Sequence, residues 1–217
     1  VLVYIDHADQ LLKKSSLEAL SYGAALAKQL GTTAEALLLG TVSDDLTELG
    51  KQGATKVHQL GNPILNPFDA KVISTLISEA AKKLNASVVV FAHNINGKAV
   101  APAVAVKLNA GIVTGACSLP DTSNGFIVTK TVFSGKAFAK INIETAVKVI
   151  SINQNSFGIV VTDQKAIVEN IDIAIPTSSI KVTSVDKVIG EVPLTEATIV
   201  VSGGRGLKGP ENWGMIE

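Results

Sequence analysis

The sequence is poor in cysteine and aromatic residues, and its charges balance, so several classes of protein are excluded at once. Only one of the 217 residues is a cysteine, Cys117, which rules out an internal disulfide framework and a cysteine-rich metal site. We expect a reducing compartment and a small, buried apolar role for this thiol. Aromatic residues make up 4% of the chain, so its core must be aliphatic. The formal net charge is zero, which gives no basic excess for nucleic acid.

Long apolar runs are also missing. No run approaches the roughly 20 apolar residues of a transmembrane helix, so we expect no membrane insertion. The first residues, "VLVYIDHADQ", read as a strand and show neither the basic region nor the cleavage site of a signal peptide. The chain does not begin with methionine, so a removed presequence stays possible.

The first half of the chain alternates between apolar runs and helical periodicity. Strands are predicted at residues 1–6, 34–40, 55–61 and 87–92, and helices at 15–30, 44–53, 67–84 and 96–111. Ser15 and Glu18 fit a capping box at a helix start, and Gly31 and Gly53 fit left-handed helix ends. Pro102 is expected to be tolerated only near the first turn of its helix. This alternation predicts a mostly parallel, Rossmann-like α/β sheet flanked by helices.

The pattern changes after Ile112, because no long amphipathic helix follows until about Val188. Residues 126–132 and 136–144 alternate around Ser134-Gly135, which predicts a β-hairpin. Further strands are expected at 146–152, 166–175 and 181–189. These added antiparallel strands form either a separate annex or extra strands that complete the first sheet.

The predicted domain organisation follows from these patterns. Residues 1–188 are expected to form an N-terminal α/β domain, and 189–196 a linker. Residues 197–217 read as the first strand and turn of a second domain, which we expect to be cut off as it begins. Pro210 suits the first position of a short helix there.

Near its C-terminus the chain reads "TIVVSGGRGLKGPENW", in which Arg205 is the only arginine of the protein. A glycine turn after a strand lets backbone approach a ligand closely, and a guanidinium there can donate a planar fork to phosphate or to the edge of a flavin. The glycines Gly203, Gly204 and Gly206 do not form the G-x-G-x-x-G dinucleotide fingerprint, and we expect them to adopt positive φ. A surface arginine in an ordinary turn is the competing interpretation.

This segment, together with "VLVYIDHADQLLKKSSLEALSYG", "GKAVAPAVAVKLNAGIVT" and "FSGKAFAKI", resembles the alpha subunit of electron transfer flavoprotein over the whole chain. The resemblance implies a heterodimer with a beta subunit and one FAD, held mostly by the second alpha domain. Electrons would arrive from acyl-CoA or related dehydrogenases, as in fatty acid oxidation, and leave to a quinone reductase or another acceptor. The protein would be an electron carrier without catalytic residues or a metal, cytoplasmic in bacteria and in the mitochondrial matrix of eukaryotes.

The same resemblance assigns the cofactor-binding residues as Gly204, Arg205 and Gly206. The family's alpha subunit continues well beyond this chain and completes the FAD site there. We therefore expect Arg205 to be exposed and without a ligand in this chain. The first domain is expected to hold no redox group and to pack against the beta subunit as a scaffold.

A second hypothesis is a stand-alone α/β nucleotide-binding or scaffold module. Asp6 and His7 follow the first strand, and His93 and Asn94 follow the fourth, where open α/β sheets bind ligands. Because no glycine-rich phosphate loop follows either strand, we favour plain structural roles for these residues. His58 lies in mid-strand, and its sequence neighbours offer no partner.

Overall fold

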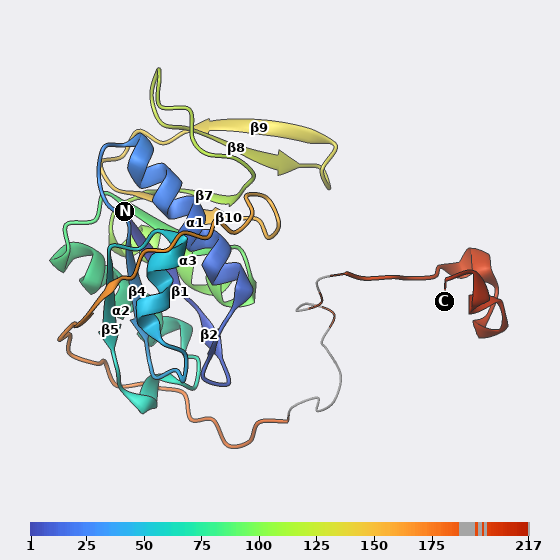
Figure 1. Cartoon of the computed structure of the whole chain (residues 1–217), viewed down its shortest axis with the longest axis horizontal. Helices are drawn as coiled ribbons and strands as arrows, with labels where there is room; N and C mark the ends of the chain where they lie inside the picture. Colours follow the sequence, from blue (N-terminus) through green and yellow to red (C-terminus); the bar gives the residue numbers. More distant parts are fainter. Residues whose placement is uncertain (187–193, 195–196, 198, 217) are drawn as a thin grey trace. The chain divides into compact units, whose positions relative to one another are not determined.

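The computed structural model describes residues 1–186, 194, 197 and 199–216. They belong to two compact units, Val1–Ile180 and Lys181–Glu217. The first unit holds the sheet and all the α-helices of the described chain, and the second holds two short 3₁₀ helices (Figure 1). The predicted linker at 189–196 lies outside the described residues except for Leu194.

One large sheet organises the first unit. Its strands are β1 (Leu2–Ile5), β4 (Glu35–Leu39), β5 (Lys56–Leu60), β6 (Val88–Ala92), β7 (Gly111–Ala116), β8 (Ile127–Val132), β9 (Ala137–Asn142), β10 (Lys148–Ile152) and β11 (Ile167–Asn170). Within the described residues their spatial order is β11-β5-β4-β1-β6-β10-β7-β8-β9. All pairs from β11 to β7 are parallel, and the pairs β7–β8 and β8–β9 are antiparallel. The predicted Rossmann-like class is confirmed.

Helices cover both faces of this sheet. The longer ones are α1 (Lys14–Gln29), α2 (Ala70–Lys83) and α3 (Ile95–Lys107), and the 3₁₀ helices are η1 (Leu46–Gln52), η2 (Pro63–Leu65), η3 (Arg205–Leu207) and η4 (Pro210–Met215). Helix α1 and η1 pack on one face, and α2 and α3 pack on the other. A two-stranded ribbon, β2 (His7–Ala8) with β3 (Leu11–Leu12), leads from β1 into α1.

The core is aliphatic, as the shortage of aromatic residues predicts. Because side chains alternate along a strand, β1 supplies Val3 and Ile5 to the cluster under α1, and Leu2 and Tyr4 to the cluster under α2 and α3. The central strand β6 is buried at every position, as expected for a parallel sheet covered on both sides.

The predicted capping box at Ser15 and Glu18 is wrong. Helix α1 begins at Lys14, one residue before Ser15, and no side chain caps its start. The Glu18 carboxylate instead accepts hydrogen bonds from the backbone N–H groups of Asn155 and Phe157, at 2.9 and 3.0 Å. The Glu18 carboxylate therefore binds a loop distant in sequence rather than the start of its own helix.

The expected position of Pro102 is also wrong, because this residue lies in the interior of α3 rather than in its first turn. A proline removes one backbone hydrogen bond of the helix, which leaves the carbonyl of Lys98 without that donor. Both Pro102 and Lys98 are exposed, so water can solvate this carbonyl. The predicted left-handed helix ends at Gly31 and Gly53 are confirmed, with φ of 67° and 95°.

In the second half of the chain, the hairpin of β8 and β9 is confirmed and extends the sheet at one edge. Strand β10 returns to lie between β6 and β7, parallel to both, and β11 adds to β5 at the opposite edge. The extra strands therefore complete the first sheet. Strand β11 ends at Asn170, and no strand forms at 181–186, the described part of the run expected at 181–189.

The second unit carries no strand in its described residues. Ile199–Val201 are exposed and unpaired, although their composition predicts a strand, because no neighbouring strand is present there to supply hydrogen bonds. Helix η4 begins at Pro210, which confirms the position expected for this proline.

Candidate functional site

The glycine–arginine turn of the second unit is built on η3. Gly204 precedes this helix with φ −102° and ψ −177°, and the N–H groups of Leu207 and Lys208 close the turn onto the carbonyls of Gly204 and Arg205, at 3.0 and 3.1 Å. The Arg205 side chain is exposed, as expected, and makes no ion pair with any described residue. Its guanidinium can therefore donate to an external group.

The role expected for the glycines is partly wrong. Gly203, Gly204 and Gly206 do not adopt positive φ, and the left-handed residue of this turn is Lys208, with φ 64°. A Cβ added at Gly204 or Gly206 would meet no atom within 4 Å, whereas one at Gly203 would collide with the side chain of Leu207. The backbone at Gly204 and Gly206 is thus open on its outer side, and a guanidinium beside bare amides suits an electron-rich or anionic group.

A second polar cluster occupies the carboxyl ends of β1 and β6, where the strand order changes direction. Asp6 is 3% exposed, and its carboxylate accepts hydrogen bonds from the side-chain amides of Asn94 and Asn96, both at 2.9 Å. Lys13 forms an ion pair with Asp6 at 3.3 Å, and the Ser16 hydroxyl bonds to both backbone groups of Asp6. The structure thus brings Asp6 and Asn94 together and commits both to internal contacts.

The two histidines predicted near this edge do not join the cluster. The His93 ring lies 2.8 Å from the Ser151 hydroxyl, and His7 lies 2.9 Å from the carbonyl of Leu39. Partial burial, with smaller contributions from the positive charges of Lys98 and Lys130, lowers the pKa of His93, which keeps the ring neutral at pH 7. The Ser151 hydroxyl that contacts His93 is fully buried, and no phosphate loop forms within the described residues, which supports the structural interpretation of these residues.

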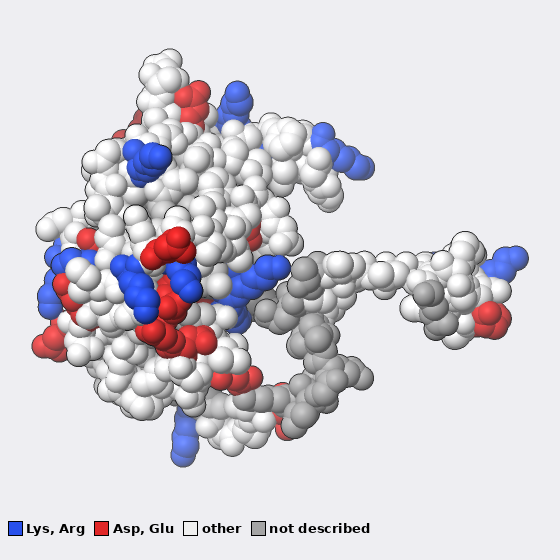
Figure 2. Space-filling view, in the orientation of Figure 1, with Lys and Arg blue, Asp and Glu red and all other residues white. Residues whose placement is uncertain are grey.

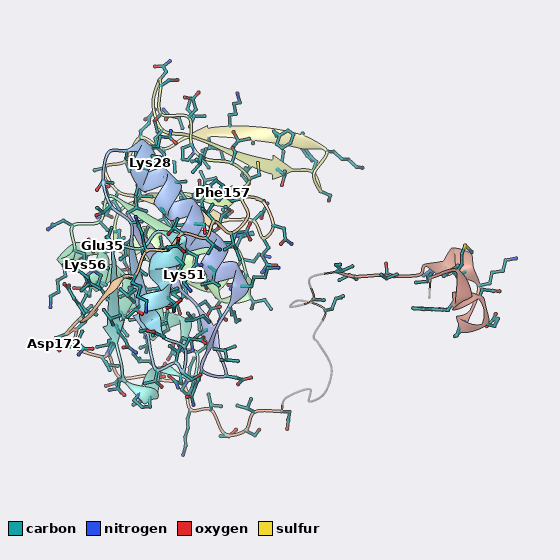
Figure 3. The ribbon with its side chains drawn as sticks, in the orientation of Figure 1. Lys28, Glu35, Lys51, Lys56, Phe157 and Asp172 are labelled. Atoms are coloured by element: carbon teal, nitrogen blue, oxygen red, sulfur yellow. The ribbon has the colours of Figure 1, made fainter. Side chains whose placement is uncertain are left out.

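Sequence reasoning missed a cluster around His58. The His58 Nε2 atom lies 2.6 Å from a Glu35 carboxylate oxygen, and Lys56 bonds to Glu169 at 2.7 Å. The parallel register places Glu35 beside Lys56, and His58 beside Glu169, on strands β4, β5 and β11; Figure 3 shows Glu35 and Lys56 close together. The available signal was that each of these strands carries charged or titratable residues at alternating positions. This signal identifies the cluster only when the order and register of the strands are known. The cluster ties β11 to β5.

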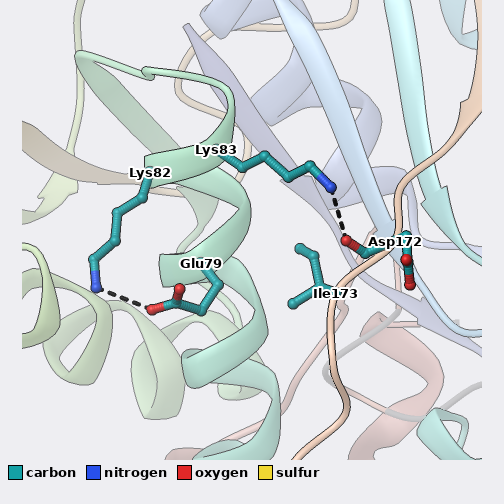
Figure 4. A pocket seen from close by; sticks show the side chains of 5 residues that line it. All are labelled: Glu79, Lys82, Lys83, Asp172 and Ile173. Carbon is teal, nitrogen blue, oxygen red and sulfur yellow. Dashed lines mark hydrogen bonds and ion pairs between the residues drawn. The ribbon is translucent and has the colours of Figure 1, made fainter.

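A surface hollow lies between α2 and the segment after β11, and its charged lining residues pair with groups of the same chain (Figure 4). Lys82 pairs with Glu79 at 2.9 Å, and the Lys83 ammonium donates to the carbonyl of Asp172 at 2.8 Å. Both lysines lie on an exposed helix face, and Lys83 also holds the segment after β11.

Other chemistry is limited in the part of the chain that the structure describes. No group of three or more potential metal ligands gathers there, and no helix there has the length and apolar character needed to cross a bilayer. The Cys117 thiol is half-buried rather than fully buried, and it donates weakly to the carbonyl of Thr129 at 3.4 Å.

The first unit is thus an α/β protein of the parallel-sheet class, with polar side chains that bond to one another at the carboxyl ends of β1 and β6, and the second unit carries an exposed glycine–arginine turn. A family model described as "Electron transfer flavoprotein domain" matches residues 1–176. The chain therefore belongs to the electron transfer flavoprotein family.

Curated relatives extend the similarity through the second unit. The chain is 27% identical over 220 residues to "Electron transfer flavoprotein subunit alpha" of Bacillus subtilis, an alignment that covers 100% of this chain and 67% of the relative. The alpha subunit of Syntrophomonas wolfei is 26% identical, with 99% and 68% covered. The subunit LctC of a lactate dehydrogenase (NAD(+),ferredoxin) from Acetobacterium woodii is 29% identical, with 100% and 53% covered. The chain thus spans about two thirds of the length of the first two relatives.

Proposed function

We propose that this chain acts as the alpha subunit of a heterodimeric electron transfer flavoprotein. Its companion is a beta subunit, its cofactor is FAD, and it carries electrons from acyl-CoA or related dehydrogenases to a quinone reductase or another acceptor. The observation that carries the proposal is the similarity to alpha subunits over 100% of the chain, which continues through the glycine–arginine turn. In bacteria the protein would work in the cytoplasm, and in eukaryotes in the mitochondrial matrix.

The FAD contact is assigned to Gly204, Arg205 and Gly206. Three features of the turn support this assignment: the guanidinium has no internal ion-pair partner among the described residues, both glycines leave their outer backbone open, and all three residues are exposed. A bound flavin takes up and releases electrons, and a fixed positive charge beside it favours the reduced, more electron-rich form. Arg205 would hold and polarise the cofactor rather than act as an acid or base.

The first domain, residues 1–188, would serve as a scaffold for the partner subunit. Its Asp6 carboxylate is engaged internally by Asn94, Asn96 and Lys13. Those contacts tie the carboxyl ends of the central strands β1 and β6 to neighbouring loops and helices, which suits a scaffold.

Expression of the gene that encodes this chain together with the gene for its companion subunit tests the proposal. We expect a yellow complex of both subunits that releases FAD on denaturation, identified by chromatography against FAD and FMN standards. A colourless complex would contradict the proposed cofactor role.

In that complex, the Arg205→Ala variant should bind FAD at least tenfold more weakly or show a lower flavin reduction potential, because a charge-assisted hydrogen bond contributes about 1.5–3 kcal/mol. Arg205→Lys should lose less, since it keeps the charge but not the planar fork. The matched control is Lys208→Ala, which removes a positive charge from the same exposed turn. If Arg205→Ala behaved like Lys208→Ala in both measurements, the assignment of Arg205 would be wrong.

A further inference from the structure

The β8–β9 hairpin leaves the edge of the sheet open. Strand β9 is the last strand in the sheet order, and within the described residues it pairs only with β8. Figure 1 shows the two strands extending beyond the helices that cover the rest of the sheet. An edge strand of this kind presents free backbone N–H and C=O groups to another chain.

Two phenylalanines stand on this hairpin with almost no cover. Phe133, in the turn, is 79% exposed, and Phe138, in β9, is 69% exposed. Phe138 lies opposite Thr131, so no aromatic or aliphatic side chain faces it across the strand pair. Exposed aromatic side chains are typical anchors of protein interfaces, and two on one short hairpin need an explanation that folding alone does not supply.

The turn also holds Phe133 in an unfavourable conformation. Phe133 and Ser134 both adopt left-handed backbone angles, with φ of 51° and 54°, before Gly135 at 84°. For a bulky residue such a conformation costs on the order of 1–2 kcal/mol, and a glycine or asparagine would avoid most of it. No packing contact within the first unit offsets this strain, because the Phe133 ring is exposed.

The charges on the hairpin indicate which kind of chain can pair with the open edge of β9. Residues 126–143 contain three lysines, Lys130, Lys136 and Lys140, and no acidic residue. Within the described residues, neither Lys136 nor Lys140 forms an ion pair, although the charge of Lys140 makes a small contribution to the lowered pKa of Asp121. Figure 2 shows lysine side chains on the projecting end of this region. Two copies paired through β9 would bring these lysines together, so the charges disfavour self-association.

We infer that the hairpin surface, defined as Phe133, Lys136, Phe138 and Lys140, binds an acidic, extended segment of the companion subunit by strand addition to β9. Backbone hydrogen bonds along β9 would supply the register, the two phenyl rings the apolar contact, and the lysines the charge complementarity. This inference rests on the proposed heterodimer, and it adds the surface and the chemistry of the contact.

Titration of the purified chain with its companion subunit, measured by calorimetry, tests the inference. The variant Phe138→Ser/Lys140→Glu should bind at least tenfold more weakly than the wild type, and its affinity should depend less on salt. The matched control is Val106→Ser/Lys107→Glu, which also replaces an exposed apolar residue by serine and an exposed lysine by glutamate, but on α3, and it should bind as the wild type does. Because both altered side chains are exposed, circular dichroism should show unchanged folding, and Lys136→Glu alone gives a milder second variant.

Hydrogen exchange of the β9 amides gives an independent measurement. We expect the β9 amides that point away from β8 to become protected when the companion subunit is added, and to stay unprotected in the chain alone at any concentration. Equal affinity of the hairpin variant and the wild type, with no protection, would overturn the inference while the heterodimer and its FAD remain. Protection that grows with the concentration of the chain alone would instead identify a second copy as the occupant. If the wild type formed no complex at all, the proposed function would fail together with the inference.

Discussion

Replacement of Asp6 by asparagine tests whether the crevice at β1 and β6 is structural or functional. One carboxylate oxygen of Asp6 accepts from Asn96, and the other accepts from Asn94 and pairs with Lys13. In Asp6→Asn one side-chain oxygen remains as an acceptor, while the new NH₂ group faces a donor, and Lys13 loses this carboxylate. A lost charged hydrogen bond costs about 1.5–3 kcal/mol, and an unsatisfied buried donor about 1–3 kcal/mol. Because Lys13 is partly exposed, we expect a loss of about 2–4 kcal/mol.

Urea denaturation followed by circular dichroism measures this loss as a lower midpoint at an unchanged slope. The control is Asp163→Asn, at an exposed position, which should change the unfolding free energy by less than about 0.5 kcal/mol. Calorimetry of the wild type with AMP and ATP completes the test. If Asp6→Asn were as stable as the control, or if the wild type bound a nucleotide with micromolar affinity and the variant did not, the structural role of Asp6 would be refuted.

Two further predictions concern pH. The Ser178 hydroxyl and the N–H groups at the start of α2 lower the pKa of Asp69, so its contribution to stability is complete above the ordinary value of 3.8 and is lost as pH falls through the lower folded value. The variant Asp69→Ala should therefore lose about 1 kcal/mol at pH 7, and the difference from the wild type in urea melts should shrink below pH 3.8 rather than persist. Burial lowers the pKa of His93, so the unfolded chain binds the proton more tightly and stability should fall as pH drops below 6.5. In His93→Gln that slope should be smaller, and an identical slope in both proteins would contradict the buried, neutral ring.

Much of the fold could be predicted because it depends on local patterns. Strand β6 is an unbroken apolar run, and α2 places Val72, Leu76 and Ala80 at helical spacing, so both were identified directly. The place of β10 could not be predicted, because its run "KVISI" specifies a buried strand but not its neighbours. The capping box at Ser15 and Glu18 was wrong for a related reason, since Glu18 bonds to a loop far along the chain.

The candidate site divides in the same way. The sequence identifies Arg205 by its rarity and its glycine setting, and the structure finds it exposed. The positive φ expected of its glycines lies on Lys208 instead, because the short helix η3 ends there and its cap takes the left-handed conformation. The contacts of Asp6 with Asn94 and Asn96 depend on two strand ends that meet only in the folded sheet.

The late arrival of β10 has a consequence for how this protein forms during synthesis. Strands β6 and β7 are consecutive strands of the chain, yet each pairs with β10, a segment that is synthesised only after the β8–β9 hairpin. Until Lys148–Ile152 emerges, one edge of β6 stays open in the growing polypeptide, and a chaperone or a premature strand pairing could occupy it.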